Sequence, residues 1–459
     1  MKKKVLLVFP DGTGVRNYFY SNAFSADVDL TLFHNFSEES IDYLQSHRPF
    51  RSAISIPKYS ESVLERFLRE LICLCRLRHN AKQVNNPTIL NFWQPKQNKM
   101  SLKVLYRSVE IASFLFNKYS HILKLEKQYQ SVIRRNPLYK EVAKILIAEK
   151  PDLIFCTHQR GLKMPVIFAA ANDLEIATTS VIYSWDNIPK ARLALRANKY
   201  LVWSDYMKRE LQTYYPEILA EQIAVTGTPQ FEFYSDPEYI IDKAVFYERY
   251  KLDIGKKIIC FSGDDVRTSP DDPKYLEDLA SGIIDSGLDN QFQILFRRAP
   301  VDVSGRYDAV VARYPELIRA SPPLWVGSKK TDWQALFPSV DDVSLLVSTA
   351  YYSDVVMNIG STMAFDFSIF EKPCIFINYD QEIQLNKKWS VKTIYNFQHF
   401  RSMPERNAVF WLNSKKEIAD TLIRATTSKN FRSIHKWSAI ILGNYTDAST
   451  KIQQTISNL

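Results

Sequence analysis

The stretch SDVVMNIGSTMAFDFSIFEKPCIFINYD, from Ser353 to Asp380, decides the fold class. Its apolar run Val355–Ile359 predicts a buried strand, and Gly360 predicts a turn into a short helix. Pro373 forbids continuation of that helix, and a second apolar run follows it. A strand, a glycine turn, a helix and another strand form the repeating unit of a parallel α/β sheet.

Similar apolar runs occur along both halves of the chain. The first is Lys4–Phe9, which a glycine-rich turn, PDGTGVRN, follows. Other runs are PDLIFCTHQR, TTSVIYSWDN, KYLVWSD and QIAVTGTPQF in the first half, and KIICFSGDD and FQILFRRAP in the second. Their hydrophobicity is continuous rather than alternating, which is typical of strands that are buried on both faces. The sequence therefore predicts two parallel sheets.

The spacing of these runs predicts the domain organisation. We expect an N-terminal domain over residues 1–235 and a C-terminal domain over residues 255–427. A helical segment over 428–459 could pack back on the N-terminal domain. Residues 57–150 lack strand-like runs and are rich in Lys, Arg and aromatic residues, so they predict a helical insertion in the first domain. Its basic face suits an anionic membrane surface, or is simply solvated.

Composition and charge narrow the class of protein. The chain has 459 residues and a formal charge of +9, which suits an anionic partner such as a nucleotide, a phospholipid surface or a nucleic acid. Its short N-terminal apolar run meets Pro10 and fails as a signal peptide. No stretch approaches the ~20 apolar residues of a membrane span. We expect a cytoplasmic protein, at most peripheral on the inner face of the plasma membrane.

No metal site is expected from the sequence. The five cysteines have no partner Cys or His at metal-binding spacing. The single Asp-x-Asp, at Asp27 and Asp29, precedes the second predicted strand and is better explained by chance.

The glycine turn could hold a phosphate group. Free N–H groups at a helix start favour a phosphate, and ligands of parallel sheets sit at the carboxyl ends of strands. Asp366 lies about one turn beyond Thr362, within range of a ribose hydroxyl or a substrate amine. Arg297 and Arg298 end another predicted strand and could clamp a diphosphate, because guanidinium groups bind phosphate oxygens bidentately. The alternatives are an ordinary tight turn at Gly360 and arginines that form surface ion pairs.

Two sequence segments carry a resemblance to known families. GSTMAFDFSIFEKPCIFINYD is similar to a segment of the CDP-glycerol glycerophosphotransferase-like clan, in which a Ser pair, a following Asp and a Lys/Arg-Pro recur. SWDN, with the later YLVWSDYMKRELQTYYPEILAEQIAVTGTPQ, resembles bacterial surface-polysaccharide glycosyltransferases. VTGTPQFEF, at the end of this stretch, resembles the glycine-proline linker of the clan. The likeness covers roughly residues 152–380. Two positions depart from the clan: Ala299 stands where it has His, and Gln230 stands where its linker has Arg. The missing His favours a sugar transferase over a polyol-phosphate transferase.

The resemblance implies an α/β fold of the GT-B type, with two Rossmann-like domains facing a cleft and the basic helical insertion in the first. It also assigns the nucleotide donor to the second domain. The implied donor-binding residues are Gly360, Ser361, Thr362, Asp366, Arg297, Arg298, Ser262 and Gly263.

The first domain is expected to supply the catalytic groups. A base that takes a proton from an acceptor hydroxyl is required for inversion, and three residues at predicted strand ends are candidates: Asp11, Asp186 and His158. Asp11 could instead form its Asp-Gly turn, and Asp186 could cap a helix. The expected acceptor side is completed by Gly12, Gly14, Arg16, Asn17 and Arg160.

These observations predict a metal-independent glycosyltransferase without a cofactor. It would move a sugar from a nucleotide-sugar donor to a lipid-linked saccharide or growing surface polysaccharide. The alternatives are a CDP-polyol-dependent transferase, a nucleotide-sugar epimerase, which needs more acid/base residues in the cleft, and a basic membrane- or nucleic-acid-binding protein. No nucleic-acid partner is expected, because the basic residues are spread out and no recognised motif is present.

Overall fold

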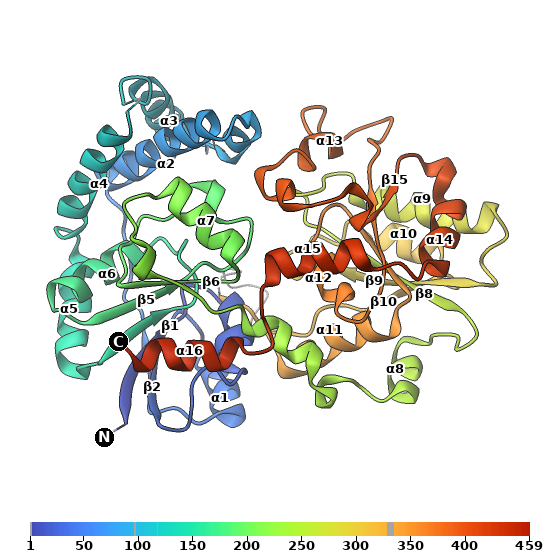
Figure 1. The fold of residues 1–459 in the computed structure, drawn as a ribbon, viewed down its shortest axis with the longest axis horizontal. Coiled ribbons are helices and arrows are strands. Elements are labelled where there is room, and N and C mark those ends of the chain that lie inside the picture. Colours follow the sequence, from blue (N-terminus) through green and yellow to red (C-terminus); the bar gives the residue numbers. More distant parts are fainter. Residues whose placement is uncertain (1, 96–97, 117, 328–334) are drawn as a thin grey trace.

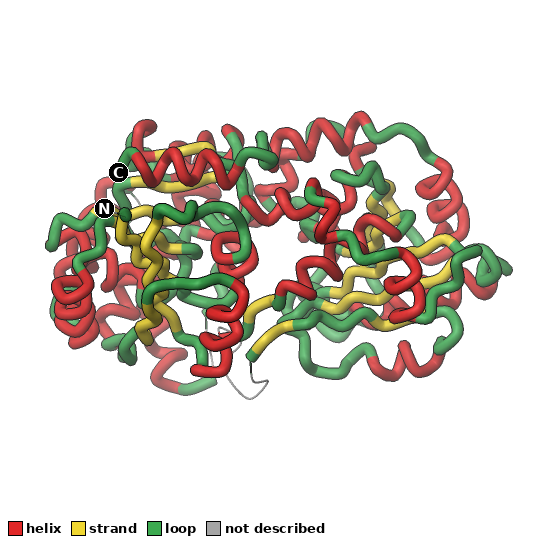
Figure 2. The backbone as a smooth tube through the Cα atoms, turned by 90° about the horizontal axis from the view of Figure 1, so that it is seen from below, coloured by secondary structure: helices red, strands yellow, loops and turns green. Residues whose placement is uncertain are grey.

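The structure is a computed structural model that describes residues 2–95, 98–116, 118–327 and 335–459. Two α/β domains lie side by side, one on a seven-stranded and one on a six-stranded sheet (Figures 1 and 2). All neighbouring strands within both sheets are parallel. The predicted pair of parallel sheets is therefore confirmed.

The first sheet has the order β3-β2-β1-β4-β5-β6-β7. Its strands are β1 (Lys3–Val8), β2 (Val28–His34), β3 (Ser52–Ser55), β4 (Leu153–Cys156), β5 (Ala177–Val181), β6 (Lys199–Val202) and β7 (Ile223–Val225). The connecting helices include α1 (Glu38–His47), α6 (Met164–Asp173) and α7 (Asp205–Tyr214). β1 lies in the interior of the sheet because its run from Val5 to Val8 is apolar on both faces and fully buried.

The second sheet has the order β10-β9-β8-β13-β14-β15. Its strands are β8 (Lys257–Gly263), β9 (Phe292–Arg298), β10 (Ile318–Ala320), β13 (Val355–Asn358), β14 (Cys374–Ile377) and β15 (Phe410–Leu412). Around it lie α8 (Lys243–Tyr250), α9 (Asp272–Asp285), α10 (Asp308–Arg313), α11 (Val340–Tyr352), α12 (Met363–Ser368), α13 (Val391–Ile394) and α14 (Ile418–Thr427). A separate antiparallel pair joins β11 (Trp325–Val326) to β12 (Phe337–Pro338).

The insertion between β3 and β4 is helical. It contains α2 (Val63–Gln83), α3 (Met100–Ala112), α4 (Tyr119–Ile133) and α5 (Pro137–Glu149). α2 begins with a capping box, in which the Ser62 side chain accepts from the N–H of Glu65 and the Glu65 carboxylate accepts from the N–H of Ser62. None of the helices in the described part of the chain has both the length and the apolar character of a transmembrane span.

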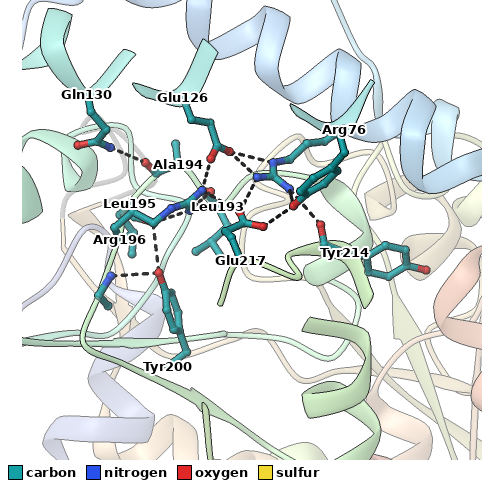
Figure 3. Close-up of polar contacts among 12 residues, drawn as sticks. Arg76, Glu126, Gln130, Leu193, Ala194, Leu195, Arg196, Tyr200, Tyr214 and Glu217 are labelled. Atoms are coloured by element: carbon teal, nitrogen blue, oxygen red, sulfur yellow. Dashed lines mark hydrogen bonds and ion pairs between the residues drawn. The ribbon is translucent and has the colours of Figure 1, made fainter. Parts of the chain in front are cut away.

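A buried ionic network fixes the insertion to the first domain (Figure 3). Arg76 of α2 donates to Glu126 of α4 at 2.6 Å and to Glu217, which follows α7, at 2.7 Å. Arg196 pairs with the same two carboxylates. The Arg76 side chain is only 1% exposed, so its charge depends on these partners rather than on water.

The C-terminal segment crosses back to the first domain. α15 (Arg432–Leu442) lies against the second domain, and α16 (Ala448–Ser457) runs along the first, close to the N-terminus (Figure 1). Lys3 donates to the carbonyl of Ile456 at 2.6 Å, and the N–H of Ser449 donates to Glu232 at 2.7 Å. The chain therefore passes between the domains twice, which limits their relative movement.

Candidate active site

A cavity of about 290 Å³ lies between the two domains. It forms where the carboxyl ends of β1, β5, β8, β9 and β13 approach one another, as expected for ligand sites of parallel sheets. The first domain and the linker contribute Thr13, Arg16, Tyr183 and Gln230 to its wall. The second domain contributes Ser262, Gly263, Asp264, Arg297, Arg298, Ala299, Pro300, Trp325, Pro338, Asp342, Leu346, Ser361, Thr362, Met363 and Asp366.

The glycine turn after β13 brings Ser361 and Thr362 to the cavity wall. Gly360 has a φ of +69°, and a Cβ at this position would lie 2.6 Å from the ring of Phe400. Only glycine satisfies both constraints. The side chain of Asn358 accepts a hydrogen bond from the N–H of Ser361 at 2.9 Å and holds the turn. Gly360 itself shapes the backbone and does not line the cavity.

Arg297 at the end of β9 is held in the cavity wall by Asp342. Its Nη2 lies 2.9 and 3.0 Å from the two carboxylate oxygens of Asp342. Asp342 also accepts from the indole of Trp325 and from the N–H of Leu324. The Nη1 of Arg297 is buried and has no hydrogen-bond partner among the described residues. Since a buried unpaired donor is costly, this nitrogen is suited to an anionic ligand.

Asp366 lies in the cavity wall and accepts a hydrogen bond from Tyr234 at 2.6 Å. Burial raises the pKa of Asp366 to about 6, against the opposing effects of the Tyr234 hydrogen bond and of the charges on Arg16 and Arg297. This carboxyl group can therefore change protonation state near neutral pH.

The raised pKa of Asp366 predicts a pH-dependent stability cost. The folded state holds this proton more tightly than the unfolded state, so stability is lost as the pH rises from about 4 to above 6. An Asp366→Asn variant keeps an acceptor for Tyr234 and should be more stable than the wild type at pH 7.5 by about 2–3 kcal/mol. The gain should disappear near pH 4 in thermal unfolding. Asp308→Asn, at an exposed carboxylate, is the control and should change the stability little at either pH. An equal stability gain of Asp366→Asn at pH 7.5 and at pH 4 would contradict the raised pKa of Asp366.

Asp11 and His158 form a pair in the first domain. Nδ1 of His158 lies 2.6 Å from Oδ2 of Asp11, and Thr13 donates to the other carboxylate oxygen. Burial alone would raise the pKa of Asp11, but the charge and hydrogen bond of His158, with the hydrogen bonds from Thr13, bring it below its usual value. Nε2 of His158 is buried without a hydrogen-bond partner among the described residues. Tyr183, which lines the cavity, packs against the His158 ring.

Three other predicted acceptor-side residues, Gly12, Gly14 and Asn17, contact neighbouring protein groups rather than the cavity. A Cβ on Gly12 would lie 1.9 Å from the carbonyl of Leu336, and one on Gly14 would lie 2.4 Å from Thr157. Asn17 is buried and donates to Gln230 at 3.2 Å. These contacts explain the glycine-rich sequence after β1 without a direct role at the cavity.

Two further predicted residues, Asp186 and Arg160, also lie outside the cavity wall. Asp186 forms an ion pair with Lys190, and the charge of His399 also acts on it, so its pKa is lowered in spite of burial. Arg160 is exposed and is not part of the wall. The structure therefore brings together Arg16 from the first domain and the predicted second-domain residues other than Gly360.

The cavity and cavity-supporting residues that were not predicted include Tyr183, Tyr234, Asp264 and Asp342. Asp264 directly follows the Ser262-Gly263 pair, so its position after a strand was the available signal. Burial and the neighbouring carboxylate of Asp272 raise the pKa of Asp264 well above its usual range. Asp342 lies in the first turn of α11, far in sequence from its partner Arg297, and no local pattern marks it.

Comparison with known proteins was made for both sequence and structure. No protein-family model matches the chain, and no curated protein is similar to it in sequence. A putative UDP-N-acetylglucosamine 2-epimerase from Listeria monocytogenes has a TM-score of 0.55 at 10% identity, covering 100% of this chain and 96% of that one. UDP-GlcNAc 2-epimerase from Methanocaldococcus jannaschii gives 0.53 at 11%, over 100% of both chains. The Neisseria meningitidis enzyme bound to UDP-GlcNAc gives 0.52 at 10%, over 99% and 100%.

These matches confirm the GT-B-like fold and correct the predicted activity. The specific resemblance to the glycerophosphotransferase-like clan and to surface-polysaccharide glycosyltransferases is not confirmed. The prediction of a glycosyltransferase is wrong on this comparison, because the three structures described above, which match this chain over both domains, are named as UDP-GlcNAc 2-epimerases. The motifs could not separate the two activities, since a glycine turn and an arginine at a strand end suit a nucleotide diphosphate in either case. At these identities, the likeness shows the GT-B-like fold.

Proposed function

We propose that the chain is an enzyme that binds a nucleoside diphosphate sugar and inverts one carbon of the sugar, as a nucleotide-sugar epimerase. The observation that carries this proposal is the interdomain cavity, where cationic donors and ionisable groups from both domains face the same space. The match to UDP-GlcNAc 2-epimerases over the whole chain supports it. An epimerase needs no acceptor, so this function requires no lipid-linked or polysaccharide partner.

The second domain would bind the nucleotide diphosphate. Arg297 offers a buried, unpaired Nη1, and Arg298 lies beside it in the wall. Arg16 approaches from the first domain and acts on the same carboxyl group, Asp366, as Arg297 does. Positive charge from both domains therefore converges on one region, which suits a diphosphate that bridges the cleft.

The sugar would lie between acid/base groups of opposite domains. Inversion of a carbon that carries hydrogen requires a base that takes a proton from one face and an acid that returns one to the other. Asp366 and Asp264 line the second-domain wall, and burial raises the pKa of both. The Asp11–His158 pair lies behind the first-domain wall, with Nε2 of His158 unpaired among the described residues. These groups are the acid/base candidates that an epimerase requires.

Product analysis tests the proposed reaction. The purified chain is incubated with UDP-GlcNAc and, in parallel, with other UDP-, GDP- and CDP-sugars, and the mixtures are followed by proton NMR. The proposal predicts that one nucleotide sugar is converted to an equilibrium mixture with its epimer, while the nucleotide stays attached to the sugar at equilibrium. Absence of an epimer from every substrate, with sugar transfer to an added saccharide, would contradict it.

Arg297→Lys should weaken nucleotide binding. Lysine can still pair with Asp342 and preserve the buried charge balance, but it lacks the second guanidinium arm that carries the unpaired Nη1. We expect the Kd for the nucleotide that binds the wild type to rise about tenfold to hundredfold in calorimetric titration, the value of a charged hydrogen bond. Arg313→Lys, at an exposed ion pair on α10, is the matched control. Unchanged affinity in Arg297→Lys would place the diphosphate elsewhere.

A further inference from the structure

The outer side of the helical insertion carries a concentration of exposed apolar side chains. They lie at the start of α2 and along α3 and the residues directly after it, and each is 52–75% exposed. We call this surface the α3 face, and it consists of Val63, Leu64, Met100, Val104, Ile111, Phe114 and Leu115. Elsewhere in the described chain, large apolar side chains with comparable exposure are scattered singly or in pairs over several elements. Scattered residues of that kind are normal, whereas a contiguous patch indicates a binding surface.

The spacing along α3 places the apolar residues on one side of the helix. Met100, Val104 and Ile111 are separated by four and seven residues, and Phe114 and Leu115 follow in the turn after the helix. Tyr106 and Val109 on the other side are buried against the rest of the insertion. α3 is therefore apolar on its solvent side as well as on its packed side, which is unusual for a helix on a protein surface.

A groove lies in the α3 face, between α3 and the start of α2. Its volume is about 730 Å³, and its wall is mainly apolar. The apolar lining residues are Val63, Leu64, Phe67, Leu102, Val104 and Leu105. A groove of this character could hold a hydrocarbon chain.

Positive charge surrounds the apolar stripe. Lys99, Lys103 and Arg107 are exposed at the start of α3 and along it, and Lys118 is exposed at the start of α4. The one acidic residue in the sequence from 99 to 118 is Glu110, which is half-buried and accepts hydrogen bonds from Arg107 and Trp93. An apolar stripe flanked by Lys and Arg is the pattern of a helix that lies in the surface of an anionic membrane.

We propose that the α3 face binds the surface of a bilayer that contains anionic phospholipids. The apolar side chains would enter the acyl boundary while the flanking cations contact the phosphate groups. α3 lies at the outer edge of the first domain, far from α16 and both termini (Figure 1). The interdomain cavity has no wall residue from α2 or α3, so membrane contact leaves it free. This inference is independent of the reaction proposed above.

Vesicle co-sedimentation tests this proposal. The full-length protein should sediment with vesicles of phosphatidylcholine and phosphatidylglycerol, and much less with phosphatidylcholine alone or at high salt. The double variant Val104→Glu/Ile111→Glu should bind the anionic vesicles at least about tenfold more weakly, because two carboxylates enter the apolar interface. Both positions are exposed, so the melting temperature should stay close to that of the wild type.

The matched control is Ile254→Glu/Ile383→Glu, which adds the same charge at residues that are 73% and 82% exposed away from the insertion. It should bind the vesicles as the wild type does. Equal binding by both double variants would overturn the proposal. If both bound weakly, the added negative charge alone would explain the loss, and if both bound like the wild type, the α3 face would not contact the membrane. The proposal would also be overturned if the wild type ignored anionic vesicles and instead formed a dimer that Val104→Glu/Ile111→Glu disrupts in light scattering. In that case a second copy of the chain covers the face.

Discussion

Asp11→Asn should lower kcat for the proposed epimerisation by about 10²–10³-fold, the usual contribution of a positioned acid/base group. The carboxylate of Asp11 accepts from Nδ1 of His158, and its negative charge and this hydrogen bond orient the ring. Asparagine keeps a similar shape but removes that charge, and it can favour the wrong ring tautomer. In that tautomer Nε2 of His158 carries the hydrogen and cannot accept a proton. The Kd for the nucleotide should change by no more than about threefold, because Asp11 does not line the cavity, whereas the proposed diphosphate-binding arginines of both domains do.

Asp186→Asn is the matched control for this prediction. Both carboxylates follow strands of the first sheet, and the sequence alone could not choose between them. Asp186 is paired with Lys190 outside the cavity wall, so its loss should reduce kcat by less than about threefold. The reverse result, with Asp186→Asn inactive and Asp11→Asn active, would contradict the assignment of the acid/base pair.

Arg76→Met should destabilise the helical insertion by about 3–5 kcal/mol, the cost of breaking a buried ion pair from one side. The substitution removes bonds to Glu126, Glu217, Tyr119 and the carbonyl of Tyr214 (Figure 3). Two carboxylates would then share the single charge of Arg196, which is partly exposed. Hydrogen exchange should show lost protection in α2 and α4, while the strands of the second sheet keep theirs.

Lys82→Met is the control on the same helix, because Lys82 is exposed. It should change the melting temperature little. The double variant Arg76→Met/Glu126→Gln should recover part of the loss, since the remaining carboxylate of Glu217 keeps Arg196 as its partner. A melting temperature for Arg76→Met equal to that of the wild type would show that the network contributes nothing to stability.

The architecture could be predicted because each strand is a local signal. Continuous apolar runs such as those of β1 and β13 indicate strands that are buried on both faces. Gly360 and Pro373 mark the two ends of the helical segment between two strands. The observed limits differ by a residue or two: β1 covers Lys3–Val8 and β13 covers Val355–Asn358. Such differences arise because strand ends are set by pairing partners, which a single segment does not contain.

The candidate site was predicted only where its residues follow strands. Arg297, Ser361 and Asp366 were found in this way, and the structure brings them to one cavity. The partners that set their chemistry are distant in sequence: Asp342 holds Arg297, and Tyr234 holds Asp366. Side-chain pairing over such separations has no periodicity that could reveal it. The predicted activity was wrong for a related reason. A glycine turn and an arginine at a strand end suit a nucleotide diphosphate whether the enzyme transfers or epimerises the attached sugar.

Isotope exchange at the inverted carbon tests the central claim most directly. The chain is incubated in D₂O with the nucleotide sugar that it converts, beginning with UDP-GlcNAc, and the C2 position is followed by NMR and mass spectrometry. A two-faced acid/base reaction breaks the C–H bond and returns a proton from an exchangeable group, so deuterium should enter at the carbon that inverts. The Asp11→Asn variant should slow this exchange in proportion to its kcat. Recovery of every nucleotide sugar without epimer and without deuterium, by protein that binds the nucleotide, would contradict the account.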